Sequence, residues 1–556
     1  MAGTSGGLRA FGAPRSSSRQ RPAWARFRAS RTALMSFFRS ALLAALAVAL
    51  APAPAAQADC RNGTAIVSDV GSFPCRNVDL VGYLPRATFA VGTSGAAGHN
   101  DIWGWTDPET GVEYALVGTE NGLGFVDLST PSEPRLVGKL PASGQASSWR
   151  DVKVYGDHAY VVADSSPGHG VQAFDLTRLR GATGAPVLFT EDARYTGIGS
   201  AHNIVINEET GYGYVVGARR VGSDQPAECG ARGFHVIDLR DPPNMTFVTC
   251  FSDAARDANP RITAGYTHDA QCVVYRGPDA DYRGREVCLG ANEDVVTVFD
   301  VQDKSDVQIV SQAAYPNDAY THQGWLDASQ RYFLINDEID ERNGLVPFQR
   351  TIVMDFLDLD DPEVAFVYDS GLTTIDHNLY VRGRYAFESN YQSGLRILDL
   401  DQIGSGTLTE VAFFDTYPAS DGLSYDGNWS NYPYFESGLV IANDISNGLF
   451  VLRPAAALAV ATEEGTAGSG YALSAPFPNP SSDGARLTLR VDDGQRVVAE
   501  LFDVAGRRVA SVFDGAVGSG QTVELEVRRG DLPAAVYLVR VRGEGFEASR
   551  RLVLTR

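Results

Sequence analysis

The sequence predicts an all-β protein: a seven-bladed β-propeller, closed by an N-terminal strand and followed by a small C-terminal Ig-like β-sandwich. Three observations predict this fold. A unit of about 50 residues returns seven times, a near-copy of one of its strands precedes the first unit, and the pattern changes after residue 470. A period near 50 residues made of short β-runs is typical of propellers and related repeat architectures.

Each unit opens with a His or a replacement for it, crosses two short apolar strands, reaches an acidic or Asn-rich turn, and closes on an apolar strand ending in Asp-Leu or a similar pair. The openers are His99, Arg150, His202, His268, His322, His377 and Asn428, and successive openers lie 51, 52, 66, 54, 55 and 51 residues apart. A polar turn and one more apolar strand follow most closing strands. Each unit therefore supplies the four strands of one blade.

The seventh unit lacks its fourth strand, because the chain enters an Ala-rich segment after residue 454. The run Asp-Leu-Val-Gly-Tyr-Leu-Pro at 79–85 nearly copies the fourth strand of the first unit at 135–141. Pairing this early strand with the last unit would remove open sheet edges, which otherwise invite aggregation. We therefore expect seven blades in residues 59–454, sealed by the early strand lying beside residues 449–452.

The first 58 residues are typical of a secretory signal peptide. They hold eight Arg, no Lys and no acidic residue, followed by an apolar run at 41–50 and a small-residue end at 56–58. These are a basic n-region, a short h-region and an A-x-A cleavage site, and the apolar run is too short to span a bilayer. Translation could also start at Met35, since residues 35–58 form a complete signal alone. Cleavage near Ala58 and Asp59 would leave a secreted chain with no transmembrane segment.

Six cysteines remain after signal removal, an even number in an oxidising compartment, which favours disulfides. Local pairing predicts the bonds Cys60–Cys75, Cys229–Cys250 and Cys272–Cys288. A Zn or Fe–S site is the alternative, but the sequence has no C-x-x-C spacing to support it.

Charge argues against nucleic acid as a partner. The formal charge is −21 for the whole chain and −29 without the eight Arg of the signal, and residues 471–556 carry only +1 of it. The field of the repeat region therefore repels nucleic acid and anionic membranes. Solvation in a salty medium and cation binding both fit such a charge, and the charge alone does not choose between them.

Residues 455–470 are Ala-rich and then rich in Gly, Ser and Thr, which predicts a linker. Residues 471–556 alternate apolar and polar positions between short turns, which predicts the sandwich. With Pro-Phe-Pro-Asn-Pro at 476–480, Leu-Phe-Asp-Val-Ala-Gly-Arg-Arg-Val at 501–509 and Leu-Val-Leu at 552–554, this segment resembles the type A C-terminal sorting domain of the type IX secretion system. The resemblance implies a partner, the type IX secretion machinery, and release or attachment at the cell surface. An ordinary Ig-like adhesion module is the alternative.

The repeat region resembles the choice-of-anchor B family of LVIVD-repeat propellers between residues 78 and 452. The resemblance rests on Ser-Ala-His-Asn at 200–203, Thr-His-Gln-Gly-Trp-Leu at 321–326, Asp-His-Asn at 376–378 and Glu-Ser-Asn-Tyr-Gln-Ser-Gly-Leu-Arg at 388–396. The family is named for its varied surface anchors, and the resemblance implies no established reaction. The chemistry has to be argued from the residues.

In a propeller the first strand of each blade lines the channel, so the openers and the acidic turns that follow strand two should converge on one rim. The candidate binding residues are His99, His202, His268, His322, His377, Glu120, Glu293, Asp337, Glu338, Glu388, Asp444 and Trp325. Among them, His202, His268 and His322 are the candidate metal ligands. Imidazole with carboxylate suits Zn, Mn or Fe, whereas carboxylates with Asn carbonyls suit Ca.

The openers have a structural interpretation too. His, Asn and Asp at strand starts often bond the backbone of a neighbouring turn, so the repeated His could be a latch copied by duplication. No nucleophile elbow, His-Glu-x-x-His helix or phosphate loop appears, so the sequence assigns no catalytic residue and no certain cofactor. It predicts a secreted or cell-surface binding or scaffold protein with an unknown extracellular ligand. A metal-dependent hydrolase at the channel mouth and a glycan-binding adhesin that uses Trp325 are the alternatives.

Overall fold

The computed structural model describes residues 57–67, 70–92, 97–221, 233–253, 266–455 and 471–555, the last range with short gaps. The described residues form strands almost throughout, joined by turns and the short 3-10 helices η1 (Arg86–Phe89), η2 (Leu176–Leu179), η3 (Pro242–Asn244) and η4 (Ile403–Ser405). The prediction of an all-β protein is therefore confirmed. Most of the predicted signal peptide and the predicted linker lie outside the described residues.

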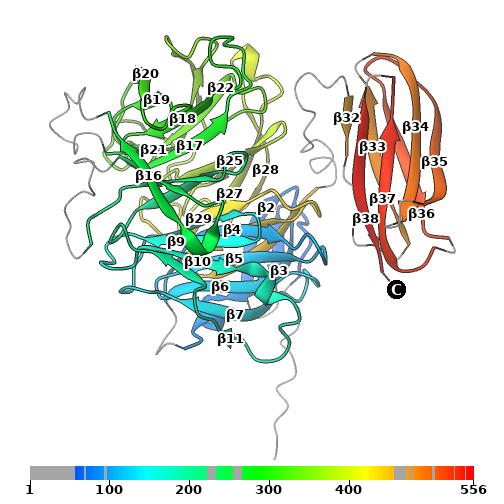
Figure 1. The fold of residues 1–556 in the computed structure, drawn as a ribbon, viewed down its shortest axis with the longest axis horizontal. Coiled ribbons are helices and arrows are strands. Elements are labelled where there is room, and N and C mark those ends of the chain that lie inside the picture. The colour runs from blue at the N-terminus through cyan, green and yellow to red at the C-terminus, as the bar shows by residue number, and fades with distance from the viewer. Residues whose placement is uncertain are drawn as a thin grey trace, which may run out of the picture. The chain divides into compact units, whose positions relative to one another are not determined.

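Within the described residues up to 455, seven sheets follow one another along the chain, each built mainly from consecutive antiparallel strands (Figure 1). The first sheet has β4 (His99–Thr106), β5 (Glu113–Thr119), β6 (Gly122–Asp127) and β7 (Arg135–Pro141). The second has β8 (Arg150–Tyr155), β9 (His158–Ala163), β10 (Val171–Asp175) and β12 (Ala193–Tyr195), while the intervening β11 (Val187–Leu188) pairs in parallel with β7. The third has β13 (Asn203–Asn207), β14 (Tyr212–Val216), β15 (Phe234–Asp238) and β16 (Thr246–Phe251).

The remaining four sheets repeat this order. The fourth has β17 (Asp269–Val274), β18 (Glu286–Ala291), β19 (Val296–Asp300) and β20 (Gln308–Ala313). The fifth has β21 (Thr321–Leu326), β22 (Tyr332–Asp337), β23 (Arg350–Asp355) and β24 (Glu363–Asp369). The sixth has β25 (Asn378–Arg382), β26 (Tyr385–Ser389), β27 (Leu395–Asp399) and β28 (Thr409–Phe414), and the seventh has β29 (Asn428–Tyr432), β30 (Val440–Asp444), β31 (Gly448–Pro454) and β3 (Val78–Pro85).

The Asp-Leu pair that closes the third strand of most units has a structural cause. The Asp accepts, at Oδ1, the backbone N–H of the residue two positions on, over 2.8 to 3.1 Å, which forms an Asx turn. The residue after the Asp is buried in the core. Just before the Asp, five of these strands carry a register shift against the fourth strand. Such bulges increase the local twist of a sheet.

The sheets close into a ring through their first strands and through the chain's N-terminal part. Each first strand contacts that of the next sheet, and β29 of the seventh contacts β4 of the first. In the seventh sheet β3 pairs antiparallel with β31, with Leu80 opposite Leu452 and Leu84 opposite Leu449. The early strand thus lies where its sequence predicts, and it covers the edge that β31 would otherwise expose.

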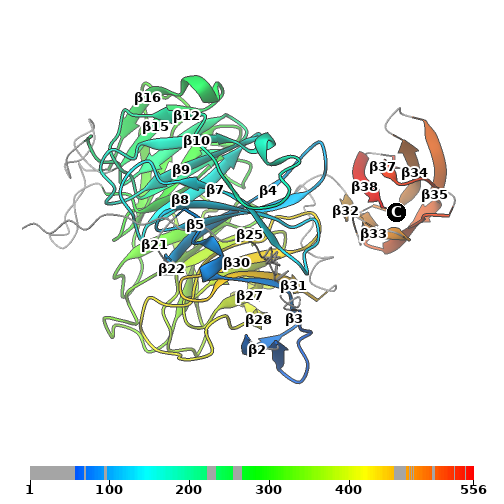
Figure 2. The ribbon, with the colours of Figure 1, turned by 90° about the horizontal axis from the view of Figure 1, so that it is seen from below.

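The hairpin of β1 (Thr64–Val67) and β2 (Gly71–Arg76) extends a different sheet. Strand β2 pairs with β28 through Cys75 opposite Phe414, so the hairpin belongs to the sixth sheet (Figure 2). Phe73 stacks on Phe414 with ring centroids 5.6 Å apart and packs edge-on against Phe450 of the seventh sheet at 5.5 Å. The hairpin therefore contacts both the sixth and the seventh sheet.

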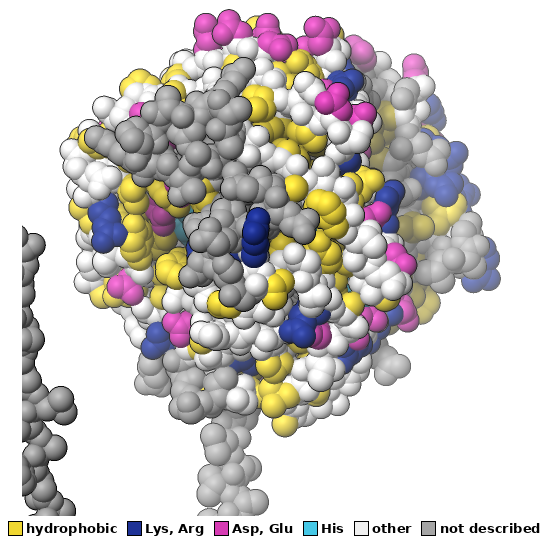
Figure 3. All heavy atoms as spheres, turned by 60° about the vertical axis from the view of Figure 1, so that its left-hand side comes forward, with side chains coloured by type: hydrophobic (Ala, Val, Ile, Leu, Met, Phe, Trp, Pro, Cys, Tyr) yellow, Lys and Arg dark blue, Asp and Glu magenta, His cyan; other side chains and the backbone are white. Residues whose placement is uncertain are grey.

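Acidic side chains gather along the upper edge of the face drawn in Figure 3, with few basic ones among them. In the part of the chain that the structure describes, no helix is long and apolar enough to cross a membrane. The surface agrees with the strongly acidic composition of the chain.

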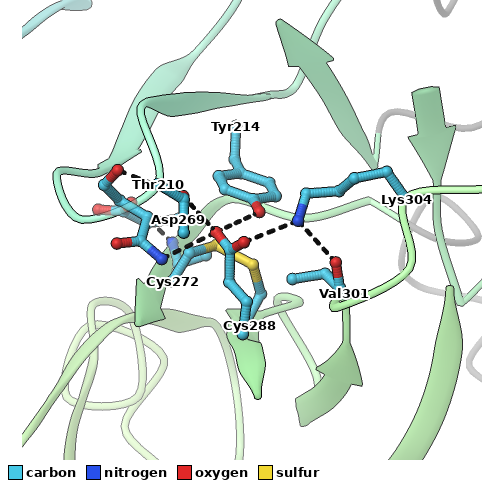
Figure 4. Close-up of a disulfide and its surroundings, with 10 residues drawn as sticks. Thr210, Tyr214, Asp269, Cys272, Cys288, Val301 and Lys304 are labelled. Carbon is cyan, nitrogen blue, oxygen red and sulfur yellow. Dashed lines mark hydrogen bonds and ion pairs between the residues drawn. A yellow bond between two sulfur atoms is a disulfide. The ribbon is translucent and has the colours of Figure 1, made fainter. Parts of the chain in front are cut away.

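Two of the three predicted disulfides are confirmed. Cys60 is bonded to Cys75 and Cys272 to Cys288, with Cα atoms 5.9 Å and 4.1 Å apart. The second bond links β17 and β18, and Tyr214 and Lys304 lie beside it (Figure 4). The predicted bond Cys229–Cys250 involves Cys229, which lies outside the described residues, so this pairing stays a prediction.

The C-terminal residues form two further antiparallel sheets. One has β32 (Tyr471–Leu473), β33 (Gly484–Val491) and β36 (Thr522–Arg528), and the other has β35 (Arg508–Val517), β34 (Gln495–Asp503), β37 (Ala535–Arg542) and β38 (Glu547–Leu554). Alternate residues of both sheets, among them Leu487 and Leu501, share one buried apolar core. Two sheets around a common core agree with the predicted sandwich.

Candidate ligand site at the histidine arc

Four openers form one continuous arc of imidazole rings. His202, His268, His322 and His377 lie where the first strands of the third to sixth sheets begin, and we refer to them as the His arc. Neighbouring ring centroids are 4.2, 4.2 and 4.3 Å apart, because the first strands of these sheets contact one another in order around the ring.

Three of the arc histidines bond a backbone carbonyl at the start of the next sheet's first strand. The Nδ1 atom lies 2.9 Å from the next carbonyl oxygen for His268, 3.2 Å for His322, and 2.6 Å for His377, whose partner is Trp429. A carbonyl oxygen only accepts, so Nδ1 carries the proton and Nε2 keeps its lone pair. These contacts have the geometry of a latch between sheets, and they also leave three Nε2 atoms as acceptors. His202 differs, since its Nδ1 lies 3.2 Å from Oδ2 of Asp164.

The first two openers do not join the arc. His99 donates from Nδ1 to Oδ1 of Asn443 at 2.8 Å, and its ring packs edge-on against Phe89. Arg150 is buried and donates to the carbonyl oxygen of Thr119 at 3.0 Å and to Nε2 of His169 at 2.7 Å. These two acceptors stabilise the buried guanidinium of Arg150. Burial lowers the pKa of Arg150 to about 10.

Glu338 is the carboxylate that lies beside two histidines of the arc. Its Oε2 lies 3.8 Å from Nε2 of His322, and its Oε1 lies 3.7 Å from Nε2 of His377. Burial raises the pKa of Glu338 to about 7, although the hydroxyl of Tyr391, which donates to Oε1 at 2.7 Å, acts to lower it. Burial lowers the pKa of His377 to about 3 and that of His322 well below its ordinary value, so both imidazoles are neutral at pH 7.

Two neutral imidazoles and a carboxylate in this arrangement could hold a transition metal. One ligand atom each from His322, His377 and Glu338 lies within 4.8 Å of the other two. This donor set suits Zn, Mn or Fe. Metal-binding histidines usually donate their other ring nitrogen to a backbone carbonyl or carboxylate, as both of these do.

Tyr391 holds Glu338 from a strained position. Its φ is +41°, in a region that residues other than Gly rarely adopt. A β-bridge with Asn428 fixes it, with backbone N–O distances of 3.1 and 2.8 Å. Strain of this kind gathers at functional sites, where the surrounding structure imposes it.

A cavity of about 480 Å³ lies over this group, and we refer to it as the rim cavity. Its lining residues are Gly98, His99, Glu120, Ser148, Trp149, Tyr320, Glu338, Ile339, Tyr391, Tyr425, Trp429 and Ile445. Trp149 is 45% exposed and Tyr425 37% exposed. Five aromatic rings and two carboxylates therefore enclose a space whose described lining contains no Lys or Arg.

Trp325 does not belong to the rim cavity, contrary to the prediction. It lines a second cavity of about 480 Å³, together with Trp103, Lys153 and Tyr380, and its ring lies 5.1 Å from that of Tyr380. The reason is the rise of a β-strand, about 3.3 Å per residue, which carries Trp325 roughly 10 Å along the strand from the opener His322.

Three of the predicted acidic residues form hydrogen bonds within the sheets and do not line the rim cavity. Asp337 accepts from the hydroxyl of Tyr315 and from two backbone N–H groups. Glu388 accepts from the hydroxyl of Thr351 at 2.7 Å, and Asp444 accepts from that of Thr416 at 2.7 Å. These carboxylates are buried against their own sheets, and none of the three is among the residues that line the rim cavity.

Two predicted acids remain near the openers. Glu120 lines the rim cavity directly. Glu293 pairs through its backbone with Thr321, and its side chain bonds the cavity residue Tyr320. The sequence reasoning missed Tyr320, Tyr391 and Tyr425, although each lies within four residues of an opener or of an acidic turn.

The match to one family model agrees with this class of fold. The LVIVD repeat family matches residues 113–140 and 144–166, which span β5 to β9. The repeats, together with the ring of sheets, define a repeat-based protein of the β-propeller type. No curated protein matches the chain. Among solved structures, a crystal structure of a protein from Lactobacillus plantarum aligns with 77% of this chain and 99% of its own, at 11% identity and a TM-score of 0.38.

Proposed function

We propose that this chain is an exported seven-bladed β-propeller, similar to the choice-of-anchor B proteins, that binds an extracellular ligand in the rim cavity. Seven first strands in cyclic contact and the matching LVIVD repeats support the blade number. The observation that carries the binding function is the rim cavity itself, with exposed aromatic rings beside two partly buried carboxylates. A solvent-exposed Trp at the mouth of a concave site is typical of ligand binding.

The lining favours a ligand with a cationic group. Trp149 and Trp429 offer π faces to a cation, and Glu120 supplies negative charge. Glu338 adds to this charge as it ionises, since burial raises its pKa to about 7. An organic cation such as an alkylammonium group would meet both without needing a basic partner from the protein. A sugar could stack on the same rings, so a glycan is the competing ligand.

Tryptophan fluorescence tests this function. Titration with tetramethylammonium should change the emission of the wild-type protein, because Trp149 and Trp429 line the cavity. The variant Trp149→Ala should lose the response, whereas Trp325→Phe, in the second cavity, should keep it. A response only to neutral oligosaccharides would assign the cavity to a glycan, and no response to either probe would contradict a binding function there.

The His arc supports a second function, a metal-dependent hydrolase. A metal held by His322, His377 and Glu338 could lower the pKa of bound water, and Glu120 on the cavity wall could serve as a base. Equilibrium dialysis against Zn²⁺ followed by elemental analysis tests the site. His377→Ala should lose the bound metal, while His158→Gln, at the start of β9 and outside the His arc, should keep it. Absence of metal in the wild-type protein would exclude the hydrolase.

Export is the remaining part of the proposal. We propose that residues 1–58 direct the chain to the Sec pathway and that residues 471–556 direct it to the type IX secretion machinery. Mass spectrometry of the secreted protein should find an N-terminus at Asp59. Deleting residues 471–556 should leave the rest of the chain in the periplasm, and secretion of the shortened chain would contradict the role of this segment.

A further inference from the structure

Three carboxylates outside the rim cavity form a second candidate cation site. Asp340 and Glu341 lie in the turn that follows β22, and Asp376 lies just before β25 of the next sheet. One oxygen from each lies within 4.8 Å of the others. All three side chains are buried, with exposed fractions of 0%, 4% and 1%.

The polar atoms of this cluster are incompletely satisfied, and burial raises the pKa of Glu341 to about 10 and that of Asp376 well above its ordinary value, with neighbouring carboxyls adding to both shifts. Nε of Arg350 pairs with Oδ2 of Asp340 at 2.5 Å. Both carboxylate oxygens of Glu341 and Oδ1 of Asp376 are buried and have no hydrogen-bond partner. A buried carboxylate without a partner costs several kcal/mol, so a fold rarely keeps two of them together. The unpartnered oxygens point to a bound cation that would satisfy them.

The chemistry of the donors selects the kind of cation. The cluster offers only oxygen atoms, which hard cations prefer, whereas Zn and other transition metals favour nitrogen or sulfur. Mg²⁺ binds few carboxylates and retains several waters, while Ca²⁺ accepts many protein oxygens, including a carboxylate bound through both. Glu341, with two free oxygens, fits that last role.

We propose that Asp340, Glu341 and Asp376 bind a Ca²⁺ ion that ties the fifth sheet to the sixth. The turn that supplies two of the ligands also carries Glu338 and Ile339, which line the rim cavity. The ion would therefore fix this wall of the cavity. The site itself depends on no assumption about the ligand of that cavity.

Thermal unfolding of the full chain, treated with EGTA and then titrated with CaCl₂ alone, tests the site. Ca²⁺ should raise the Tm of the wild-type protein, since a ligand that binds only the folded state stabilises it. MgCl₂ at the same concentration should raise it less. Glu341→Gln and Asp376→Asn should remove the response to Ca²⁺. They should also match or exceed the wild-type Tm in EGTA, because an amide does not carry the charge whose burial the folded state disfavours.

Two controls separate this site from other acidic groups. Asp360→Asn changes an exposed cluster of Asp279, Asp358 and Asp360 and should leave the Ca²⁺ response intact. His158→Gln, at the start of β9, should also leave it intact. No response in the wild-type protein, or a full response in both Glu341→Gln and Asp376→Asn, would overturn the Ca²⁺ site.

Discussion

Single side chains hold the turns of this protein in place, and Asp107 is the clearest case. Its carboxylate accepts from Nε and Nη2 of Arg180 at 2.9 and 2.7 Å and from the hydroxyl of Thr110 at 2.7 Å. Burial acts to raise the pKa of Asp107, but these bonds outweigh it and lower the pKa from 3.8 to about 2. The pair thus links the first sheet to the residues that follow β10.

The stability that this carboxylate contributes should depend on pH in a defined direction. A pKa lowered by folding gives stability that is present above 3.8 and lost as the pH falls towards 2. Asp107→Asn should therefore unfold more easily at pH 7, by about 1 kcal/mol since Arg180 is partly exposed. The difference from wild type, measured by urea unfolding, should shrink between pH 4 and pH 2. A difference that stays constant over this range would contradict the role of the charge.

Gly104 shows where the absence of a side chain matters. A Cβ atom on Gly104 would lie 2.2 Å from Cε1 of Tyr432, which closes the second cavity. Gly104→Ala should therefore cost about 1 to 3 kcal/mol through overpacking. Gly404→Ala is the matched control, because its Cβ would meet nothing closer than 3.6 Å. Equal urea midpoints for the two variants would refute the steric argument.

For single residues, the sequence predicts which side chains open each repeat better than it predicts which cavity a given side chain lines. The His arc could be predicted in outline, because its members open successive repeats. Trp325 could not be placed, since three residues of strand carry it to the other cavity. Tyr391 reaches Glu338 through a positive φ, which no local pattern in the sequence indicates. The Ca²⁺ ligands come from two units and meet only in the ring.

Among the elements, β3 and the hairpin of β1 and β2 have different roles. Strand β3 covers the edge of β31, whereas the hairpin adds to a sheet that already has four strands. The seventh sheet could be predicted because β3 copies a strand of the repeat. The hairpin and the parallel β11 could not, since both lie outside the repeat and follow no period.

Deletions should separate these roles. Removing residues 59–77 should lower the Tm, because Phe73 leaves the core, but the protein should stay monomeric. Removing residues 59–85 should also expose the backbone of β31 and cause aggregation, which size-exclusion chromatography would detect. If both shortened proteins eluted as monomers, the sealing role of β3 would be wrong.

For the whole molecule, the apolar cores divide on either side of the predicted linker. One core cluster is built entirely from residues 471–554, and every other cluster lies before residue 455. The composition of residues 455–470, Ala-rich and then rich in Gly, Ser and Thr, is what predicts a linker between these two parts.

The repeat region and residues 471–556 have separate apolar cores, so they should unfold in two separate thermal transitions. Differential scanning calorimetry of the full chain should resolve them, and cleavage between residues 455 and 470 by limited proteolysis should leave both midpoints unchanged. A shift of either midpoint after cleavage would show that the parts stabilise each other, contrary to separate domains.

The strand that completes the last sheet is synthesised early, after only β1 and β2 among the described strands. Tyr83 donates to the carbonyl oxygen of Asn447, 364 positions further along the chain. The backbone N–H and C=O groups of β3 therefore cannot pair with β31 until nearly all strands of the ring have been synthesised. Contacts of such long sequence separation form late in folding. A chain that ends before β31 has no partner strand for β3, so it cannot close the ring.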